Sequence, residues 1–183
     1  MRKTVKNKRG FTLVEMMLSL AIITIIFGLT TALMMAIRDS FMTTVNTNDS
    51  ADYGQLYAMG FEESLLKYTN DGTAGTWSIT DNLLKIGTKA VFTPTQLQTT
   101  NPSGARVDKW KIQMYFNVAA EGRVDYIIYV IDNYYDPGKL TYTYQSSVWL
   151  PHFSKTNDGE LIEGGSPDPK NSDYHSTIQF KPV

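Results

Sequence analysis

The stretch Gly10-Phe11-Thr12-Leu13-Val14-Glu15 lies between a basic N-terminal decapeptide and a long apolar run, and it decides how the chain is organised. The run covers residues 11–37, contains no proline and carries Glu15 as its one charged residue. As a helix rising about 1.5 Å per residue it would be about 40 Å long, more than the roughly 30 Å hydrocarbon core of a bilayer. The sequence therefore predicts a helix that can cross a membrane.

An ordinary secretory signal peptide or a simple signal anchor is the common explanation for such an N-terminus. The apolar run is longer than the usual signal-peptide core of about 7 to 15 residues, and no convincing A-x-A-like site follows it. The small residue at the boundary between charged and apolar sequence, Gly10, lies before the apolar segment rather than after it. These features, together with the internal carboxylate, argue against both explanations.

Glu15 is the most informative residue of the run. A carboxylate is costly to place in an apolar membrane helix, so such a residue is expected to have a function. The cost falls if an ammonium group lies at similar depth, most usefully on a neighbouring copy of the chain. An ion pair of this kind adds little net stability, but an unpaired charge is strongly penalised. Glu15 is therefore predicted to set the register between neighbouring chains.

The basic leader, the Gly10-Phe11 junction, Glu15 and the apolar run together resemble the class III signal of type IV pilins and of the pseudopilins of type II secretion and competence systems. The resemblance covers the N-terminal part of the chain. It implies that a prepilin peptidase cuts between Gly10 and Phe11, that the amine of Phe11 is N-methylated, and that Glu15 aligns subunits in a helical filament. The implied partners are other pilin or pseudopilin subunits, the prepilin peptidase, an inner-membrane assembly platform and, before assembly, membrane lipid.

The chain departs from the family pattern in two ways. Many members have a proline near the middle of the apolar helix, whereas the first proline here is Pro94. Many Gram-negative pilins close a C-terminal loop with a disulfide, and this chain has no cysteine. The missing proline and a large irregular head favour a minor pilin or minor pseudopilin over the major subunit.

Charge is distributed unevenly along the chain. The net charge is -1, but the leader holds five basic residues; without them 12 basic residues face 18 acidic ones, a net charge of -6. By the positive-inside rule, the N-terminus lies in the cytoplasm and the head outside, in the cytoplasmic membrane first and then in a cell-surface or periplasmic filament. An acidic head does not indicate nucleic-acid binding, because phosphate binding requires a basic face.

Helical periodicity continues beyond the membrane segment. Apolar side chains recur at three- and four-residue intervals from Tyr53 onward, and Asn70-Asp71-Gly72 supplies a helix stop. Residues 43–50, rich in Thr, Asn and Ser, are weakly helical and are a candidate bend. The expected organisation is a cleaved leader at residues 1–10, a membrane-spanning and filament-core helix at 11–37, its amphipathic continuation at 38–70, and a β-rich head at 71–183.

The head shows strand patterns. Residues 110–118 and 140–150 alternate between apolar and polar side chains, and residues 124–131 are apolar on both faces, as expected of a central strand. With turns between them, these segments predict an antiparallel meander. Small strands are expected within residues 77–92, a long surface loop at 151–173 and a last strand at 174–180. The predicted fold class is α+β, with the long N-terminal helix packed on an antiparallel sheet.

The acidic residues of the predicted loop are candidate calcium ligands, since calcium prefers oxygen donors. They are Asp158, Glu160, Glu163 and Asp168. Their spacing matches no ligand loop, and a solvated loop or a contact surface fits the composition as well. No nucleophile elbow, Gly-rich phosphate loop or metal-ligand spacing occurs, so the sequence predicts no enzyme and no required cofactor.

Two functions follow from these observations. The first is a structural subunit of a type IV pilus or related pseudopilus, assembled through its N-terminal helix. The alternative is a single-pass, membrane-anchored extracellular binding domain that does not polymerise and keeps its leader. A role in DNA uptake, known in the family, has no basic aromatic surface to support it.

Overall fold

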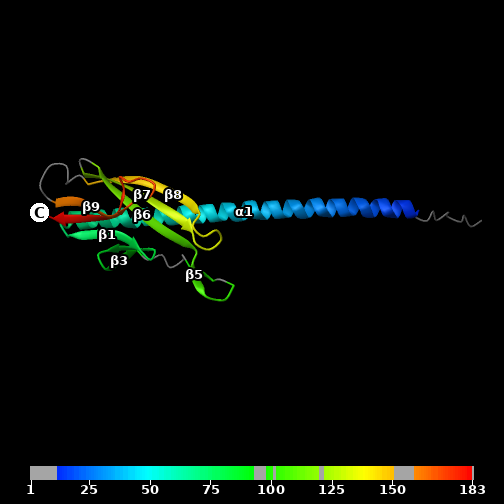
Figure 1. Ribbon diagram of the computed structural model, residues 1–183, viewed down its shortest axis with the longest axis horizontal. Coiled ribbons are helices and arrows are strands. Elements are labelled where there is room, and N and C mark those ends of the chain that lie inside the picture. The colour runs from blue at the N-terminus through cyan, green and yellow to red at the C-terminus, as the bar shows by residue number, and fades with distance from the viewer. Residues whose placement is uncertain (1–11, 93–97, 101, 120–121, 151–158, 183) are drawn as a thin grey trace, which may run out of the picture. The chain divides into compact units, whose positions relative to one another are not determined.

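The computed structural model describes residues 12–92, 98–100, 102–119, 122–150 and 159–182 (Figure 1). The chain forms two compact units, Met1–Val45 and Asn46–Val183. Helix α1 (Leu13–Asn70) contributes to both units, and the described strands all belong to the second. A helix packed on an antiparallel sheet confirms the predicted α+β class, and the fold is pilin-like.

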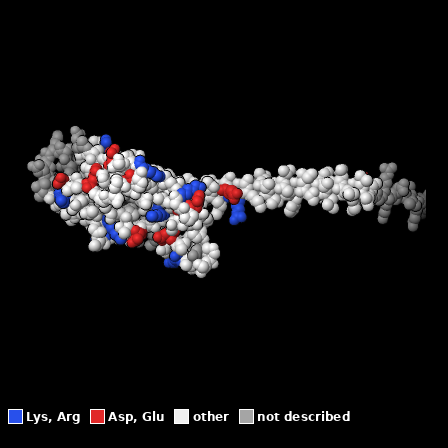
Figure 2. All heavy atoms as spheres, in the orientation of Figure 1, with Lys and Arg blue, Asp and Glu red and all other residues white. Residues whose placement is uncertain are grey.

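Helix α1 is continuous over its 58 residues. It includes residues 43–50, so the weak helix propensity of this segment does not end the helix. Throughout residues 12–45 the side chains are exposed. The most apolar window of α1 has a mean hydropathy of 2.4, so by length and composition this helix could cross a membrane. The space-filling view shows few charged side chains along this segment (Figure 2).

The C-terminal end of α1 lies at the predicted stop. Gly72 has a φ of 64°, in the left-handed region that glycine adopts without strain. The Thr73 N–H donates to the Tyr68 carbonyl at 2.9 Å, and the Gly72 N–H donates to the Thr69 carbonyl at 3.2 Å. These two bonds form a Schellman motif, which satisfies carbonyl groups that the helix itself leaves unpaired.

Within the described residues, the main sheet has eight strands in the order β3-β2-β1-β10-β6-β7-β8, with β9 also paired to β10. All of its pairs are antiparallel. A separate two-stranded sheet consists of β4 (Gln98–Thr100) and β5 (Arg106–Asp108). The main strands are β1 (Gly75–Thr80), β2 (Leu83–Ile86), β3 (Lys89–Phe92), β6 (Trp110–Ala119), β7 (Arg123–Asp132), β8 (Leu140–Trp149), β9 (Gly159–Pro167) and β10 (His175–Pro182).

Within the second unit, α1 packs one stripe of side chains onto the sheet. Tyr57, Phe61 and Leu65 lie four residues apart and are fully buried. The Phe61 ring lies 4.9 Å from that of Phe116 and 5.1 Å from that of Tyr126, between ring centroids. Burial of each large apolar side chain contributes roughly 1.5–3 kcal/mol, so this stripe is a major source of the head's stability.

The predicted meander is confirmed as β6, β7 and β8, joined in antiparallel register. Strand β7 is buried on both faces, as its continuous apolar sequence predicts. On its other face, Ile127 and Tyr129 pack in a second buried cluster with Tyr115 of β6 and Tyr174. The turn between β9 and β10 closes this cluster, because the Tyr129 hydroxyl donates to the buried Asp168 carboxylate at 2.8 Å.

The prediction of a loop over residues 151–173 is wrong for residues 159–167, whereas residues 168–173 form a turn as predicted. Strand β9 occupies Gly159–Pro167 and pairs with β10 in an antiparallel ladder. Its Gly, Ser and Pro content is typical of loops, but the last strand of the chain supplies a pairing partner that local sequence does not show. Residues 151–158 lie outside the described part of the chain.

Asn82 connects the β1–β2 hairpin to β6. Asp81 and Asn82 both have positive φ, 52° and 58°, as in the two-residue type I′ turns that join hairpin strands. The Asn82 side-chain amide donates to the Trp110 carbonyl at 2.9 Å and accepts from the Ile112 N–H at 2.8 Å. The Asn82 side chain thus makes the two backbone hydrogen bonds that a neighbouring strand would make with β6. The Tyr57 hydroxyl of α1 also donates to the Asn82 carbonyl.

Asn82→Gly should therefore lower the free energy of unfolding by about 2 kcal/mol, because glycine keeps the left-handed turn but leaves the Ile112 N–H without its partner. Asp81→Gly is the matched control in the same turn and should change stability by less than about 0.5 kcal/mol. Urea unfolding of the full chain in detergent micelles, followed by tryptophan fluorescence, measures both. Equal effects of the two variants would contradict the role given to the amide.

Candidate assembly site at the helix N-terminus

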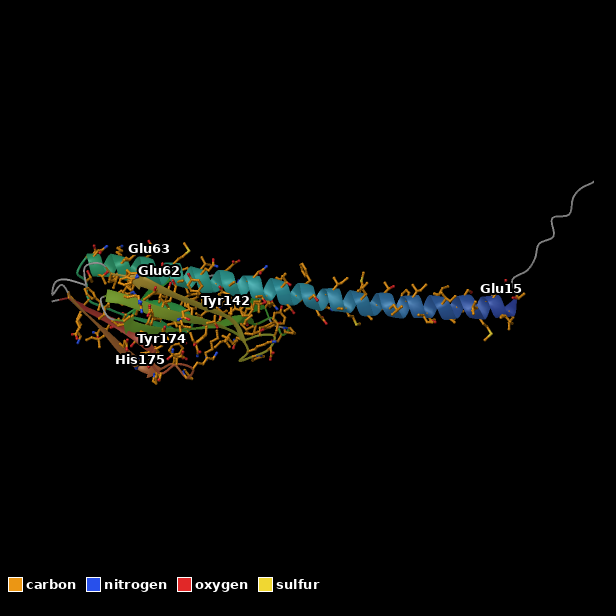
Figure 3. The ribbon with its side chains drawn as sticks, turned by 90° about the horizontal axis from the view of Figure 1, so that it is seen from above. Glu15, Glu62, Glu63, Tyr142, Tyr174 and His175 are labelled. Carbon is orange, nitrogen blue, oxygen red and sulfur yellow. The ribbon has the colours of Figure 1, made fainter. Side chains whose placement is uncertain are left out.

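Thr12 and Glu15 form a capping box at the start of α1. The Thr12 N–H and the Thr12 hydroxyl both donate to Glu15 Oε2, each at 2.9 Å. In return, the Glu15 N–H donates to Thr12 Oγ1 at 3.3 Å. Threonine at the N-cap and glutamate three residues later satisfy each other's backbone donors, which is how this sequence pattern begins a helix. Glu15 is labelled at the end of α1 in Figure 3.

The capping box determines how the Glu15 carboxylate is used. Both Thr12 bonds go to Oε2, and among the described residues Oε1 receives no hydrogen bond. The carboxylate also lies at the electropositive end of the helix dipole, which favours negative charge. One oxygen therefore begins the subunit's own helix while the other can accept a bond from a cation.

The structure places Glu15, the predicted assembly residue, in the first turn of α1. Gly10 and Phe11, the predicted processing residues, lie outside the described residues. Thr12 is a site residue that the sequence analysis did not single out. Its signal was present in the sequence, since Thr12-Leu13-Val14-Glu15 has the T-x-x-E spacing of a capping box directly before an apolar run.

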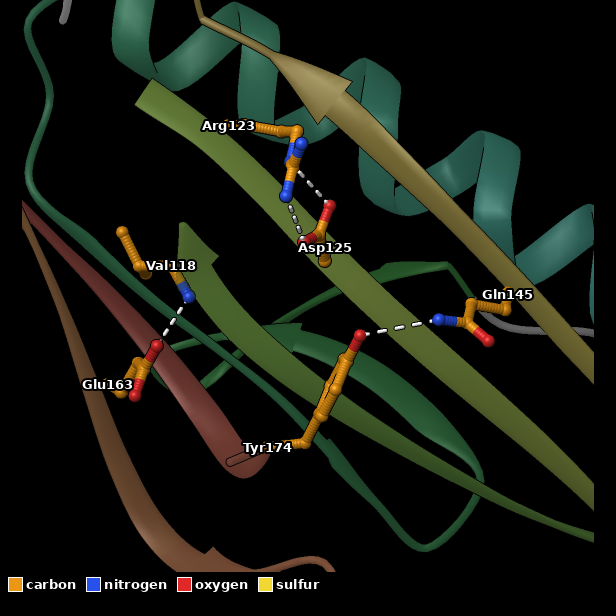
Figure 4. A network of polar contacts seen from close by, with 6 residues as sticks. All are labelled: Val118, Arg123, Asp125, Gln145, Glu163 and Tyr174. Carbon is orange, nitrogen blue, oxygen red and sulfur yellow. Dashed lines mark hydrogen bonds and ion pairs between the residues drawn. The ribbon is translucent and has the colours of Figure 1, made fainter. Parts of the chain in front are cut away.

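The candidate calcium ligands have other contacts or lie apart. Glu163, on β9, accepts the Val118 N–H with Oε1 (Figure 4), and its Oε2 lies 3.2 Å from His175 Nδ1. Asp168 accepts the Tyr129 hydroxyl and the Lys170 N–H. Glu160 is exposed on β9 and Asp158 lies outside the described residues. Within the described ranges no group of three or more His, Cys, Asp or Glu side chains could hold a metal ion.

These contacts indicate that Glu163 and Asp168 have a structural role. Burial, and after it the hydrogen bond to Asp168, raises the pKa of Tyr129 above its usual value, so the phenol stays a donor at neutral pH. Glu163 ties β9 to β6 and β10 through the backbone N–H and the imidazole that it contacts. Both carboxylates therefore hold the β9–β10 segment on the sheet.

Comparison with known families matches residues 5–31 to the model of the prokaryotic N-terminal methylation motif. The chain carries this methylation motif. The matched range contains the Gly10-Phe11 junction, the Thr12–Glu15 capping box and much of the apolar segment of α1. The motif is typical of type IV pilins and pseudopilins, which are generally structural proteins and not enzymes. No curated protein and no solved structure shows a significant match to the chain.

The capping box predicts a specific effect of changing Thr12. Thr12→Val removes the hydroxyl that both donates to Glu15 and accepts from its N–H, so the first turn should open more often and its amides should exchange about fivefold faster. Thr12→Ser keeps the hydroxyl and should exchange at the original rate. Hydrogen exchange of residues 13–16 in micelles, read by mass spectrometry, compares them; identical rates in both variants would contradict the cap.

Proposed function

We propose that this chain is a structural subunit of a type IV pilus or of a related pseudopilus, and a minor subunit of it. The observation that carries the proposal is the methylation motif joined to a helix whose first half exposes its apolar side chains along its whole length. Within the described residues nothing covers these side chains, so they need lipid or the helices of other subunits. A filament core supplies such helices.

In the proposed mechanism, the basic leader stays in the cytoplasm while residues 11–37 insert into the membrane. A prepilin peptidase cuts after Gly10, and the amine of Phe11 is methylated. The Phe11 ammonium of a neighbouring subunit then approaches Glu15. Since Thr12 uses Oε2, the incoming ammonium can bind Oε1 without opening the cap, so the helix start stays ordered during assembly.

The first test is the mass of the mature N-terminus. Protein extracted from its native membrane should begin at Phe11 and carry one methyl group on that amine, as intact-mass and N-terminal peptide spectrometry would show. A chain that still begins at Met1 or Arg2 would favour the membrane-anchored domain that does not polymerise.

Glu15 variants separate the helix cap from the charge. Glu15→Gln keeps an oxygen that can accept the Thr12 bonds but loses the charge, so insertion and cleavage should continue while incorporation into sheared filaments falls by about tenfold or more. Glu15→Val, which loses both, should incorporate no better. Immunoblots of membrane and filament fractions give the ratio; incorporation of Glu15→Gln at the original level would remove the charge from the mechanism.

The minor-subunit assignment rests on the absence of a proline before Pro94. The described helix has no proline-induced kink site, in agreement with its continuity through Asn70. Quantitative mass spectrometry of sheared filaments should find this chain at a small fraction of the abundance of the main subunit. A dominant share of the filament mass would show instead that it is the major subunit.

A further inference from the structure

A polar groove opens in the second unit where β1 and β6 separate. It has a volume of about 490 Å³ and lies between the β1–β2 turn, β6 and the start of β10. Two contacts join the flanking strands to β6, one at each end of the groove. Asn82 bridges to Trp110 and Ile112 with its side chain, and β10 pairs with β6 at one position, His175 with Phe116.

The groove is lined mainly by side chains that can form hydrogen bonds. Carboxylates, carboxamides, hydroxyl groups and an ammonium group come from segments far apart in the sequence. Its volume lies within the roughly 300–1,000 Å³ of small-molecule sites, but those sites are mostly apolar. Its occupant should therefore be polar over most of its surface. Its polar side chains include Asp81, Asp108, Lys111, Gln113, Asn133 and Ser176.

The charges of the lining restrict the occupant further. The lining has two carboxylates, Asp81 and Asp108, and one cation, Lys111, so its net charge is -1. Among the described residues Asp81 and Lys111 form no ion pair, and Asp108 uses Oδ2 to accept the Asn82 amide. Phosphorylated or otherwise polyanionic ligands are disfavoured by like-charge repulsion. A neutral ligand that can both donate and accept hydrogen bonds fits the groove best.

An extended peptide is a poorer fit than a ligand recognised by side chains. A peptide that adds a strand needs a run of free backbone groups along a sheet edge. On this edge of β6, Asn82 already bonds Trp110 and Ile112, and His175 pairs with Phe116. Every second residue of β6 points its backbone N–H and C=O toward this edge, and between the two contacts only Met114 does so. One residue is too short a stretch for a strand-pairing ladder.

We propose that this groove binds a segment of a neutral oligosaccharide. Sugar hydroxyls both donate and accept, and adjacent hydroxyls match the paired oxygens of a carboxylate and the oxygen and nitrogen of a carboxamide. Asp81 and Asp108 supply acceptors, Lys111 supplies donors, and Gln113 supplies both. The Asn133 amide donates one hydrogen to the Asp108 carbonyl and the Ser176 hydroxyl accepts the Ser166 N–H, which leaves the Asn133 oxygen as an acceptor and the Ser176 hydroxyl as a donor. The binding does not depend on filament assembly, so it can be measured on the unassembled chain.

The test uses the full chain in micelles of a detergent without a sugar head group, since a maltoside would compete. An array of neutral oligosaccharides of glucose, galactose, mannose and N-acetylglucosamine identifies a binder, and acidic glycans serve as the charge control. Asp81→Asn is the test variant because asparagine tolerates the left-handed turn, which preserves the fold. Asp136→Asn, an exposed carboxylate outside the groove, is its matched control.

The expected result is binding of at least one neutral glycan, weakened about tenfold by Asp81→Asn and unchanged by Asp136→Asn, with dissociation constants from calorimetry. Unchanged circular dichroism of both variants shows that the fold is intact. The proposal is overturned if no neutral glycan binds, if acidic glycans bind better, or if Asp81→Asn binds as tightly as the original chain.

Discussion

The head depends on the packing of one helix stripe against the sheet. Tyr57, Phe61 and Leu65 are buried, and the rings of Phe116 and Tyr126 lie against Phe61. The same helix continues toward its N-terminus with all of its apolar side chains exposed, so the two halves of one helix need different surroundings. Protein covers its second half, whereas its first half requires lipid or other chains. The proposed filament is a solution to this second requirement.

Two pairs of polar side chains form hydrogen bonds across the helix–sheet interface. The Trp77 indole N–H donates to the Ser64 hydroxyl at 3.0 Å, and the Tyr126 hydroxyl donates to the Glu62 carboxylate. Burial raises the pKa of Tyr126 above its usual value, and the bond to Glu62 adds to this, so the phenol remains a donor at neutral pH. Each bond would be lost if the helix shifted along the sheet, so these pairs specify one register for an otherwise apolar contact.

Sequence periodicity predicted the helix, its end and the three-stranded meander, because these features depend on local patterns of burial and on turn residues. Strand β9 was missed because Gly164, Gly165 and Pro167 are typical of loops, and its pairing with β10 depends on residues beyond the intervening turn. At the N-terminus, Glu15 was recognised by its charge, whereas Thr12 was overlooked although its spacing was visible. The polar groove could not be predicted, since Asp81, Lys111 and Ser176 are brought together by strand order alone.

The position of β10 has a consequence for the order in which the head can fold. β10 is the last of the described strands, yet it lies between β1 and β6 in the sheet. The meander of β6, β7 and β8 pairs strands that are close in the sequence and can form early. Strand β1, by contrast, pairs with β10, from which most of the head's sequence separates it. Until β10 has been synthesised, the β1–β3 and β6–β8 segments lack the strand that joins them, and in that interval their unpaired edges are open to proteases and to strand exchange.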